Sequence, residues 1–123
     1  MTKSVLIVED DLEIREILCE LLADEGYRTV SAANGEEALS VLRERSEQVH
    51  VIVLDLMMPL MDGRQFRSAQ LADARLAAIP VVLATAGADA ATEAKHLGAT
   101  AWLRKPFDLD DLLQAVNRAA EHG

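Results

Sequence analysis

Cysteine, aromatic side chains and long apolar runs are all scarce in this sequence. Its one cysteine, Cys19, has no partner for an internal disulfide, which is typical of a protein in a reducing compartment. We interpret Cys19 as an inert helix residue. Apolar stretches such as 51–54 and 81–84 fall far short of the roughly 18 residues that a membrane span needs. The first residues have no signal-peptide layout, so we expect a cytoplasmic protein that does not enter a membrane.

Positive charge is also in short supply. Lysine and arginine number 12 against 21 acidic residues, and the formal net charge is -9. Because proteins bind nucleic acid largely by neutralising phosphates with lysine and arginine, we expect no direct contact with DNA or RNA. Hydrophobic residues make up 50% of the 123 positions, which is enough for one core without disulfides. The sequence therefore predicts one folded domain over residues 1–123.

Short apolar runs rich in β-branched residues alternate with amphipathic stretches five times along the chain. This order is typical of an α/β fold in which helices pack on a parallel sheet. The predicted strands are residues 4–8, 28–32, 49–54, 80–84 and 100–103.

Five helices are expected between and after these strands. Gly26 is expected to end the first helix, Asn34 to cap the second and Asp108 to cap the fifth. The third covers about 64–71. The fourth, about 90–97, is alanine-rich, and we expect it to be the least firmly packed. Helical spacing predicts core positions at Ile14, Ile17, Leu18, Leu21 and Leu22 in the first helix and at Leu109, Leu112, Leu113 and Val116 in the last.

Polar residues directly follow four of the five predicted strands. They are Glu9, Asp10 and Asp11 after the first strand, Asp55 after the third, Thr85 after the fourth and Lys105 after the fifth. Because the carboxyl ends of parallel strands share one edge, where such folds bind ligands, we expect these side chains to meet. Taken singly, Asp10 or Asp11 would serve as well as a helix cap. Thr85 and Lys105 would each pass for an ordinary strand-end hydroxyl or surface lysine.

The predicted meeting of these carboxylates needs a compensating charge. Two carboxylates about 5 Å apart repel by roughly 3 kcal/mol at an effective dielectric constant of 20. Mg2+ would relieve this repulsion, because it takes oxygen ligands from one or two carboxylates and keeps waters that a phosphate can replace. The chain has no cysteine and histidine group with zinc spacing, so we interpret the histidines as structural or surface residues. They are His50, His96 and His122.

Four blocks of sequence carry a family resemblance. They are Val8-Glu9-Asp10-Asp11, residues 53–63 (VLDLMMPLMDG), Ala84-Thr85-Ala86 and Lys105-Pro106-Phe107. In this order and spacing the chain resembles the receiver domain of two-component response regulators. The resemblance implies a flavodoxin-like, doubly wound, five-stranded parallel sheet with strand order 2-1-3-4-5 and five helices.

The resemblance also implies a role for each residue of the edge. Asp55 would accept a phosphoryl group from a phosphohistidine on a sensor histidine kinase or a histidine phosphotransfer protein. Glu9 and Asp10 would bind Mg2+ together with Asp55 and the backbone carbonyl of Met57. Thr85 would donate its hydroxyl to the phosphoryl oxygens, and Lys105 would pair with the acceptor or the phosphoryl group.

Such a protein is a signalling switch and not a metabolic enzyme, since it catalyses only its own phosphorylation and dephosphorylation. Phosphorylation would alter the surface of the fourth helix, fifth strand and fifth helix and so control a partner protein or an output domain. The sequence leaves open whether it also drives homodimer formation, which kinase acts, and whether the chain is a stand-alone receiver or part of a longer regulator.

Two positions differ from the commonest family pattern. Trp102 stands where the switch aromatic is usually tyrosine or phenylalanine, and its alternative is a half-buried core aromatic. Met57, two residues after the acceptor, offers no group to orient an attacking water, so we expect slow self-hydrolysis. The alternative for Met57 is that it packs under the loop.

Three other functions were compared with this interpretation. A phosphatase of the haloacid dehalogenase class needs a second aspartate two residues after the nucleophile, where this chain has Met57. A nucleotide-binding module needs a glycine-rich phosphate loop, and no such motif follows any predicted strand. A pseudo-receiver would lack at least one of the acids, the threonine or the lysine, and all of these are present.

Overall fold

The strands and helices alternate along the whole chain. The computed structural model describes residues 2–58 and 60–122, so Pro59 of the predicted loop lies outside the described residues. The strands are β1 (Ser4–Val8), β2 (Arg28–Ala32), β3 (Val51–Asp55), β4 (Val81–Thr85) and β5 (Ala101–Arg104). The helices are α1 (Leu12–Asp24), α2 (Gly35–Arg45), α3 (Gly63–Ala72), α4 (Ala90–Leu97) and α5 (Leu109–His122), with a short 3-10 turn η1 (Ser46–Gln48).

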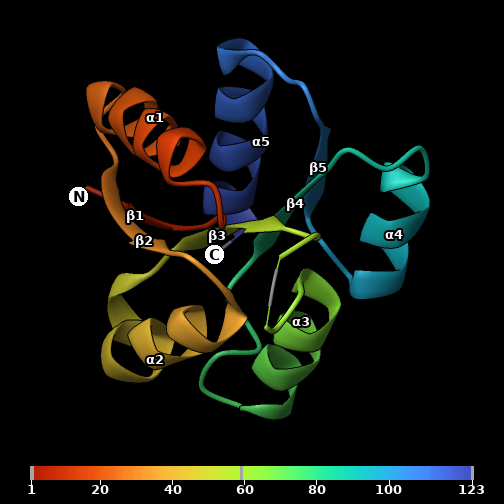
Figure 1. Ribbon diagram of the computed structural model, residues 1–123. Helices are drawn as coiled ribbons and strands as arrows, with labels where there is room; N and C mark the ends of the chain where they lie inside the picture. Colours follow the sequence, from red (N-terminus) through yellow and green to blue (C-terminus); the bar gives the residue numbers. More distant parts are fainter. Residues whose placement is uncertain (1, 59, 123) are drawn as a thin grey trace.

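The five strands form one parallel sheet in the order β2-β1-β3-β4-β5. Figure 1 shows α1 and α5 on one face of this sheet and α2, α3 and α4 on the other. The predicted flavodoxin-like, doubly wound fold is therefore confirmed. Among residues 2–58 and 60–122, no helix combines the length and apolar character needed to cross a bilayer.

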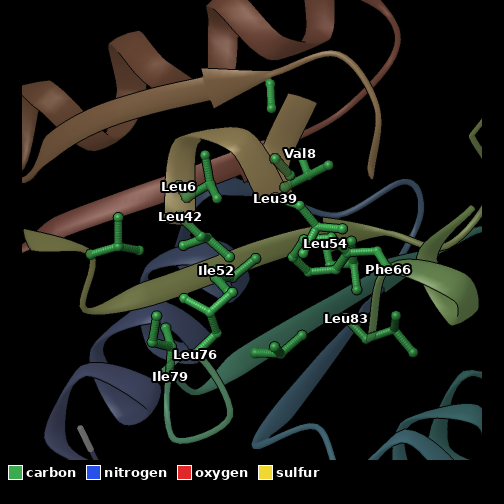
Figure 2. Packing of buried hydrophobic residues seen from close by; sticks show 14 of the residues in the cluster. Leu6, Val8, Leu39, Leu42, Ile52, Leu54, Phe66, Leu76, Ile79 and Leu83 are labelled. Carbon is green, nitrogen blue, oxygen red and sulfur yellow. The ribbon is translucent and has the colours of Figure 1, made fainter. Parts of the chain in front are cut away.

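Two apolar layers hold the helices to the sheet. Alternate residues of β1 point to opposite faces, so that Leu6 and Val8 join one layer while Val5 and Ile7 join the other. Figure 2 shows the first layer, in which Phe66 of α3 lies among the side chains of the sheet. Because both faces of the central strands are covered, every residue of β1, β3 and β4 is buried, and apolar residues run through these strands without alternation.

Three strands differ from the prediction by one or two residues at each end. The third strand covers Val51–Asp55 and not 49–54, because Ser46–Gln48 form η1 and the register with β1 begins only at Val51. The fourth and fifth strands start and end one residue later than predicted. As a result Asp55 and Thr85 are the last residues of their strands, and the backbone of the sheet sets their positions directly.

The predicted core face of α1 is wrong in part. Leu18 and Leu22 are buried, but Ile14 and Ile17 are 39% and 54% exposed. The physical reason is that β2 and β1 underlie only one side of the helix, and the other side faces a groove that α1 shares with Phe107. Helical spacing alone does not distinguish a core stripe from one that continues into an open groove.

The capping predictions for α2 and α5 are confirmed. The Asn34 side chain accepts a hydrogen bond of 2.9 Å from the Glu37 backbone N–H, and Asp108 accepts one of 2.8 Å from Asp111. In α5, Leu112 and Val116 are fully buried, and Leu109 and Leu113 are partly buried. The buried positions of α4 are only alanines, Ala90 and Ala94, and the weak packing expected of this helix stays a prediction.

His50 closes the pairing between β1 and β3. Its backbone N–H donates to the carbonyl of Ser4 at 2.9 Å, and its ring Nδ1 accepts a hydrogen bond of 3.0 Å from the Ser4 backbone N–H. The imidazole thus supplies the acceptor that a backbone carbonyl would provide if the strand extended further toward its N-terminus. Ser4 is 8% exposed, so little water can replace this acceptor.

Replacing His50 with alanine should lower the free energy of unfolding by about 1–3 kcal/mol, because the Ser4 N–H is left buried and without an acceptor. Urea denaturation measures this loss. His50→Asn should retain most of the stability, since asparagine Oδ1 lies close to the position of histidine Nδ1. The exposed His96 on α4 provides the matched control, and His96→Ala should change little. Equal losses in the alanine and asparagine variants of His50 would show that ring packing matters and the hydrogen bond does not.

Candidate functional site

The carboxyl ends of β1, β3, β4 and β5 bring together the polar residues that the sequence singled out. Glu9, Asp55 and Thr85 are buried, with 3%, 6% and 2% of their surface exposed, whereas Asp10 is open to solvent. Each buried polar side chain stands at the end of an apolar strand, so the strand itself removes it from water. The predicted convergence of these residues at one edge is confirmed.

Three carboxylates form a cluster at this edge. Glu9, Asp10 and Asp55 each offer an oxygen, and these oxygens lie within 4.8 Å of one another. Burial raises the pKa of Asp10, and the hydrogen bond and negative charge of Glu9 raise it further. A set of oxygen donors with excess negative charge fits a hard divalent cation, since Mg2+ and Ca2+ take oxygen ligands and zinc favours nitrogen and sulfur.

Lys105 compensates two of these acids. Its Nζ lies 2.8 Å from Glu9 Oε1 and 3.3 Å from Asp55 Oδ2. Burial by itself lowers the pKa of Lys105, but the hydrogen bond to Glu9 and the charges of Asp55 and Glu9 outweigh it, and the pKa is raised. Lys105 is therefore a fixed positive charge that lies between Glu9 and Asp55.

Backbone groups orient the remaining parts of the edge. The Met57 N–H donates to Asp55 Oδ1 at 3.2 Å, and the Gly87 N–H donates to Thr85 Oγ1 at 3.1 Å. The Met57 side chain is 66% exposed, so the alternative in which it packs under the loop is wrong. Its neighbours Leu56 and Met58 are both buried in the apolar layer, so Met57 projects from the loop between two inward-facing side chains.

The turn between β1 and α1 contains two neighbouring acids, of which one caps the helix and the other joins the carboxylate cluster. Asp11 caps α1 by accepting a hydrogen bond of 3.1 Å from the Ile14 N–H, which leaves Asp10 beside Glu9 and Asp55. Arg15 donates from its guanidinium to the Glu9 carbonyl at 2.8 Å and so holds the turn from the helix side. Sequence reasoning missed Arg15. A cation in the first turn of a helix opposes the helix dipole, and that irregularity was the available signal.

Gly63 is a second residue that sequence reasoning missed. It is the first residue of α3, and its N–H donates to the Leu56 carbonyl at 2.9 Å. A Cβ at this position would lie 2.8 Å from Leu56 Cα and 2.9 Å from the Asp55 carbonyl oxygen, both closer than ordinary contacts. Only glycine lets α3 approach the backbone of Asp55 this closely. The residue pair Asp62-Gly63, a helix cap followed by glycine, was the available signal.

Trp102 lies on the outer side of β5. Half of its surface is exposed, and it belongs to neither apolar layer. The alternative of a core aromatic is therefore not supported. Its strand leads directly into Lys105, and the residue two positions after it, Arg104, pairs in register with Thr85.

Known proteins with similar sequences and structures define the family. The profile of the response regulator receiver domain matches residues 5–117. Sporulation initiation phosphotransferase F of Bacillus subtilis is 35% identical over 119 residues, covering 96% of this chain and 94% of that protein. The transcriptional regulatory protein PdtaR of Mycobacterium tuberculosis is 36% identical over 118 residues, covering 95% of this chain but only 56% of that protein.

Solved structures agree with the sequence comparison. The chemotaxis response regulator CheY4 of Vibrio cholerae superposes with a TM-score of 0.87 at 34% identity, over 97% of this chain and 99% of that one. The fold and the acidic edge with its lysine define a phosphoacceptor switch of the two-component kind. The chain belongs to the receiver domain family of response regulators.

Gly63→Ala should destabilise the protein by about 1–3 kcal/mol, because the methyl group meets backbone atoms of Asp55 and Leu56 that cannot rotate away. Thermal unfolding measures the loss. Gly35→Ala is the matched control, since Gly35 is also the first residue of a helix and the three atoms nearest to its added Cβ, at 2.6–2.9 Å, belong to the side chain of Met61, which can shift more easily than backbone. If the two variants lose equal stability, the close approach of α3 to the Asp55 backbone is not the cause.

Asp10→Asn should stabilise the metal-free protein at neutral pH. Folding raises the pKa of Asp10, so its ionised form costs stability, and the cost grows as pH rises above the ordinary value of 3.8. Because Asp10 is largely exposed, solvent screening limits the gain to about 0.5 kcal/mol, or roughly 2–4 °C. The gain should vanish in acid, where both proteins carry a neutral side chain. A lower melting temperature at pH 7 in the presence of a chelator would identify Asp10 as a structural acceptor.

Proposed function

We propose that residues 1–123 form one receiver domain that switches by Mg2+-dependent phosphorylation of Asp55. The donor is a phosphohistidine on a sensor histidine kinase or a histidine phosphotransfer protein. The observation that carries the proposal is the surroundings of Asp55, a buried carboxylate with Glu9 and Asp10 on one side and the Lys105 ammonium 3.3 Å from Oδ2. The name of the Bacillus relative, a phosphotransferase, supports the same chemistry.

The proposed reaction is a displacement at phosphorus. An Asp55 carboxylate oxygen forms a bond to the phosphorus atom as the bond to the histidine nitrogen breaks, and the imidazole leaves. Glu9, Asp10, Asp55 and the Met57 backbone carbonyl would hold Mg2+, which supplies positive charge to the transferring phosphoryl oxygens when bound. Lys105 keeps its proton and balances the charge that moves onto the acceptor. The product is an acyl phosphate whose persistence is the signal.

Two residues convert this product into a change of surface. Thr85 Oγ1 already accepts the Gly87 N–H, and its own hydroxyl proton is available for a phosphoryl oxygen. Movement of Thr85 toward Asp55 would open space beside β5, into which Trp102 could turn from its exposed position. The surface formed by α4, β5 and α5 would then present a different shape to a downstream partner or output domain.

Self-hydrolysis of the acyl phosphate is expected to be slow. The exposed Met57 side chain carries no acid or amide that could orient a water on Asp55. The protein thus acts only on its own phosphoryl group and serves as a switch in the cytoplasm. With a net charge of -9 it does not bind nucleic acid by itself. The oligomeric state of the phosphorylated form will show whether a second copy is one of its partners.

Acetyl phosphate with Mg2+ should label Asp55 and no other acid, because only Asp55 is a buried nucleophile that lies beside Glu9, Asp10 and Lys105. Reduction with borohydride followed by mass spectrometry locates the modified residue. Asp55→Asn should abolish labelling, and Lys105→Met should slow it by at least about tenfold through loss of a charge-assisted contact. Full labelling of Asp55→Asn would refute the assignment.

Beryllofluoride with Mg2+, which mimics the phosphoryl group, provides the matching test of the switch. It should change the emission of Trp102, the one tryptophan of the sequence, in the natural protein and not in Asp55→Asn. If the mimic binds and the emission stays constant, Trp102 is a static surface residue and Thr85 acts without it.

A further inference from the structure

A buried arginine outside the phosphoacceptor site joins α3 to the end of α4. Arg67 of α3 is 7% exposed. Its Nε donates to the Leu97 carbonyl at 2.8 Å and one terminal nitrogen donates to the Gly98 carbonyl at 3.1 Å. These carbonyls terminate α4, where helical partners run out and the dipole favours a cation. The guanidinium is thus a cap for α4 that is supplied by another helix.

The same guanidinium is tied to the loop that precedes β4. Its other terminal nitrogen donates to Gln70 Oε1 at 2.7 Å. Gln70, fully buried, donates in turn to the carbonyls of Leu76 and Ile79, each at 3.0 Å. Among the residues that the structure describes, no acid forms an ion pair with Arg67, and burial lowers its pKa. The contact is held by a satisfied network of neutral oxygens, which is costly to break inside the protein.

The opposite end of α4 is held much more loosely. Asp89 stands at the N-cap position but makes no side-chain cap, and residues 86–89 are all exposed. The tie there is an ion pair between Arg64 and Glu93, at 2.5 Å, whose side chains are 47% and 29% exposed. Exposed ion pairs of this kind contribute little to stability. At the N-terminal end only the small side chain of Ala90 is buried, so the polar contacts anchor the helix strongly at its C-terminal end and weakly at its N-terminal end.

The loose end is also the end that is linked to Thr85. The Gly87 N–H donates to Thr85 Oγ1, and only a few residues separate Gly87 from the first turn of α4. A hydroxyl can accept this bond and donate its own proton at the same time, so a displaced Thr85 takes Gly87 with it. The anchored end is connected instead to α3, whose first residue, Gly63, is fixed on the backbone beside Asp55.

We propose that Arg67 is a positioning residue that makes the C-terminal end of α4 the fixed end of the switch, so that phosphorylation swings the helix at its N-terminal turn. This inference rests on the proposed phosphorylation of Asp55. The Arg64–Glu93 pair breaks or re-forms during the swing, while the Arg67 contacts to Leu97 and Gly98 persist. The surface change that a partner reads is then concentrated at the start of α4.

Amide hydrogen exchange measured by NMR tests the proposal at both ends of α4. The Glu93 amide, which donates to Asp89, reports the N-terminal turn, and the Gly98 and Ala99 amides, which donate to Lys95 and Ala94, report the C-terminal end. Beryllofluoride with Mg2+ should change exchange at Glu93 by about tenfold and leave Gly98 and Ala99 within about twofold. Equal changes at both ends would mean that α4 moves as a whole, and the proposal would be wrong.

Variants of the two arginines of α3 distinguish the Arg67 contacts at the C-terminal end of α4 from the Arg64–Glu93 ion pair at its N-terminal end. In the absence of the mimic, Arg67→Met should speed exchange at Gly98 and Ala99 by about tenfold or more, because the terminal carbonyls lose a charged donor. Arg67→Lys should restore part of the protection, since an ammonium reaches fewer of these acceptors. Arg64→Met, the matched control, should leave Gly98 and Ala99 unchanged. If Arg67→Met does not fold, Arg67→Lys and the natural protein still decide the outcome.

The Met57 amide shows whether the mimic occupies the site, because it donates to Asp55 Oδ1. If its resonance does not shift on addition of beryllofluoride, the proposed function fails. Hydrogen exchange in Arg67→Met is measured without the mimic, so it tests the role of Arg67 independently of phosphorylation. Unchanged protection of Gly98 and Ala99 in that variant would refute the role of Arg67, even if Asp55 is phosphorylated.

Discussion

Lys105 lies between carboxylates that would otherwise repel one another at a buried sheet edge. Its ammonium is 2.8 Å from Glu9 and 3.3 Å from Asp55, and neither acid has much access to water. This arrangement leaves the negative charge only partly balanced, since Asp10 adds a third carboxylate. An edge that is short of positive charge suits the divalent cation and the phosphoryl group that we propose for it. The proposed phosphoryl transfer thus depends on an excess of negative charge that the fold holds at this edge.

The parallel sheet keeps this negative charge in place because its strands fix the positions of the polar residues. Asp55 and Thr85 are the last residues of buried strands, and Gly63 places α3 against the backbone of Asp55. Rigid packing around Asp55 is combined with a looser segment after Thr85. A switch needs both, since a small displacement at a fixed site is transmitted only if some neighbouring element is free to respond.

Much of the fold and the site followed from pattern alone. The three central strands were predicted because they contain apolar runs buried on both faces. Glu9, Asp10, Asp55, Thr85 and Lys105 were found because the ends of parallel strands meet at one edge. Prediction failed where burial depends on neighbours. Ile14 and Ile17 have the spacing of core residues yet border a groove, and Met57 projects into solvent.

The residue pattern by itself determined the alternation of strands and helices and the acidic edge, because both depend on the apolar runs and the residues that follow them. The strand order 2-1-3-4-5 was implied by the family resemblance. Only the tertiary structure decided which acid caps α1, that Arg15 holds the Glu9 carbonyl, and that Arg67 caps a helix about thirty residues further along the chain. Such contacts join residues whose separation follows no period. Every residue has a backbone carbonyl, so the sequence does not show which carbonyl a long, flexible arginine side chain will contact. The partner is known only when packing has brought the two groups together.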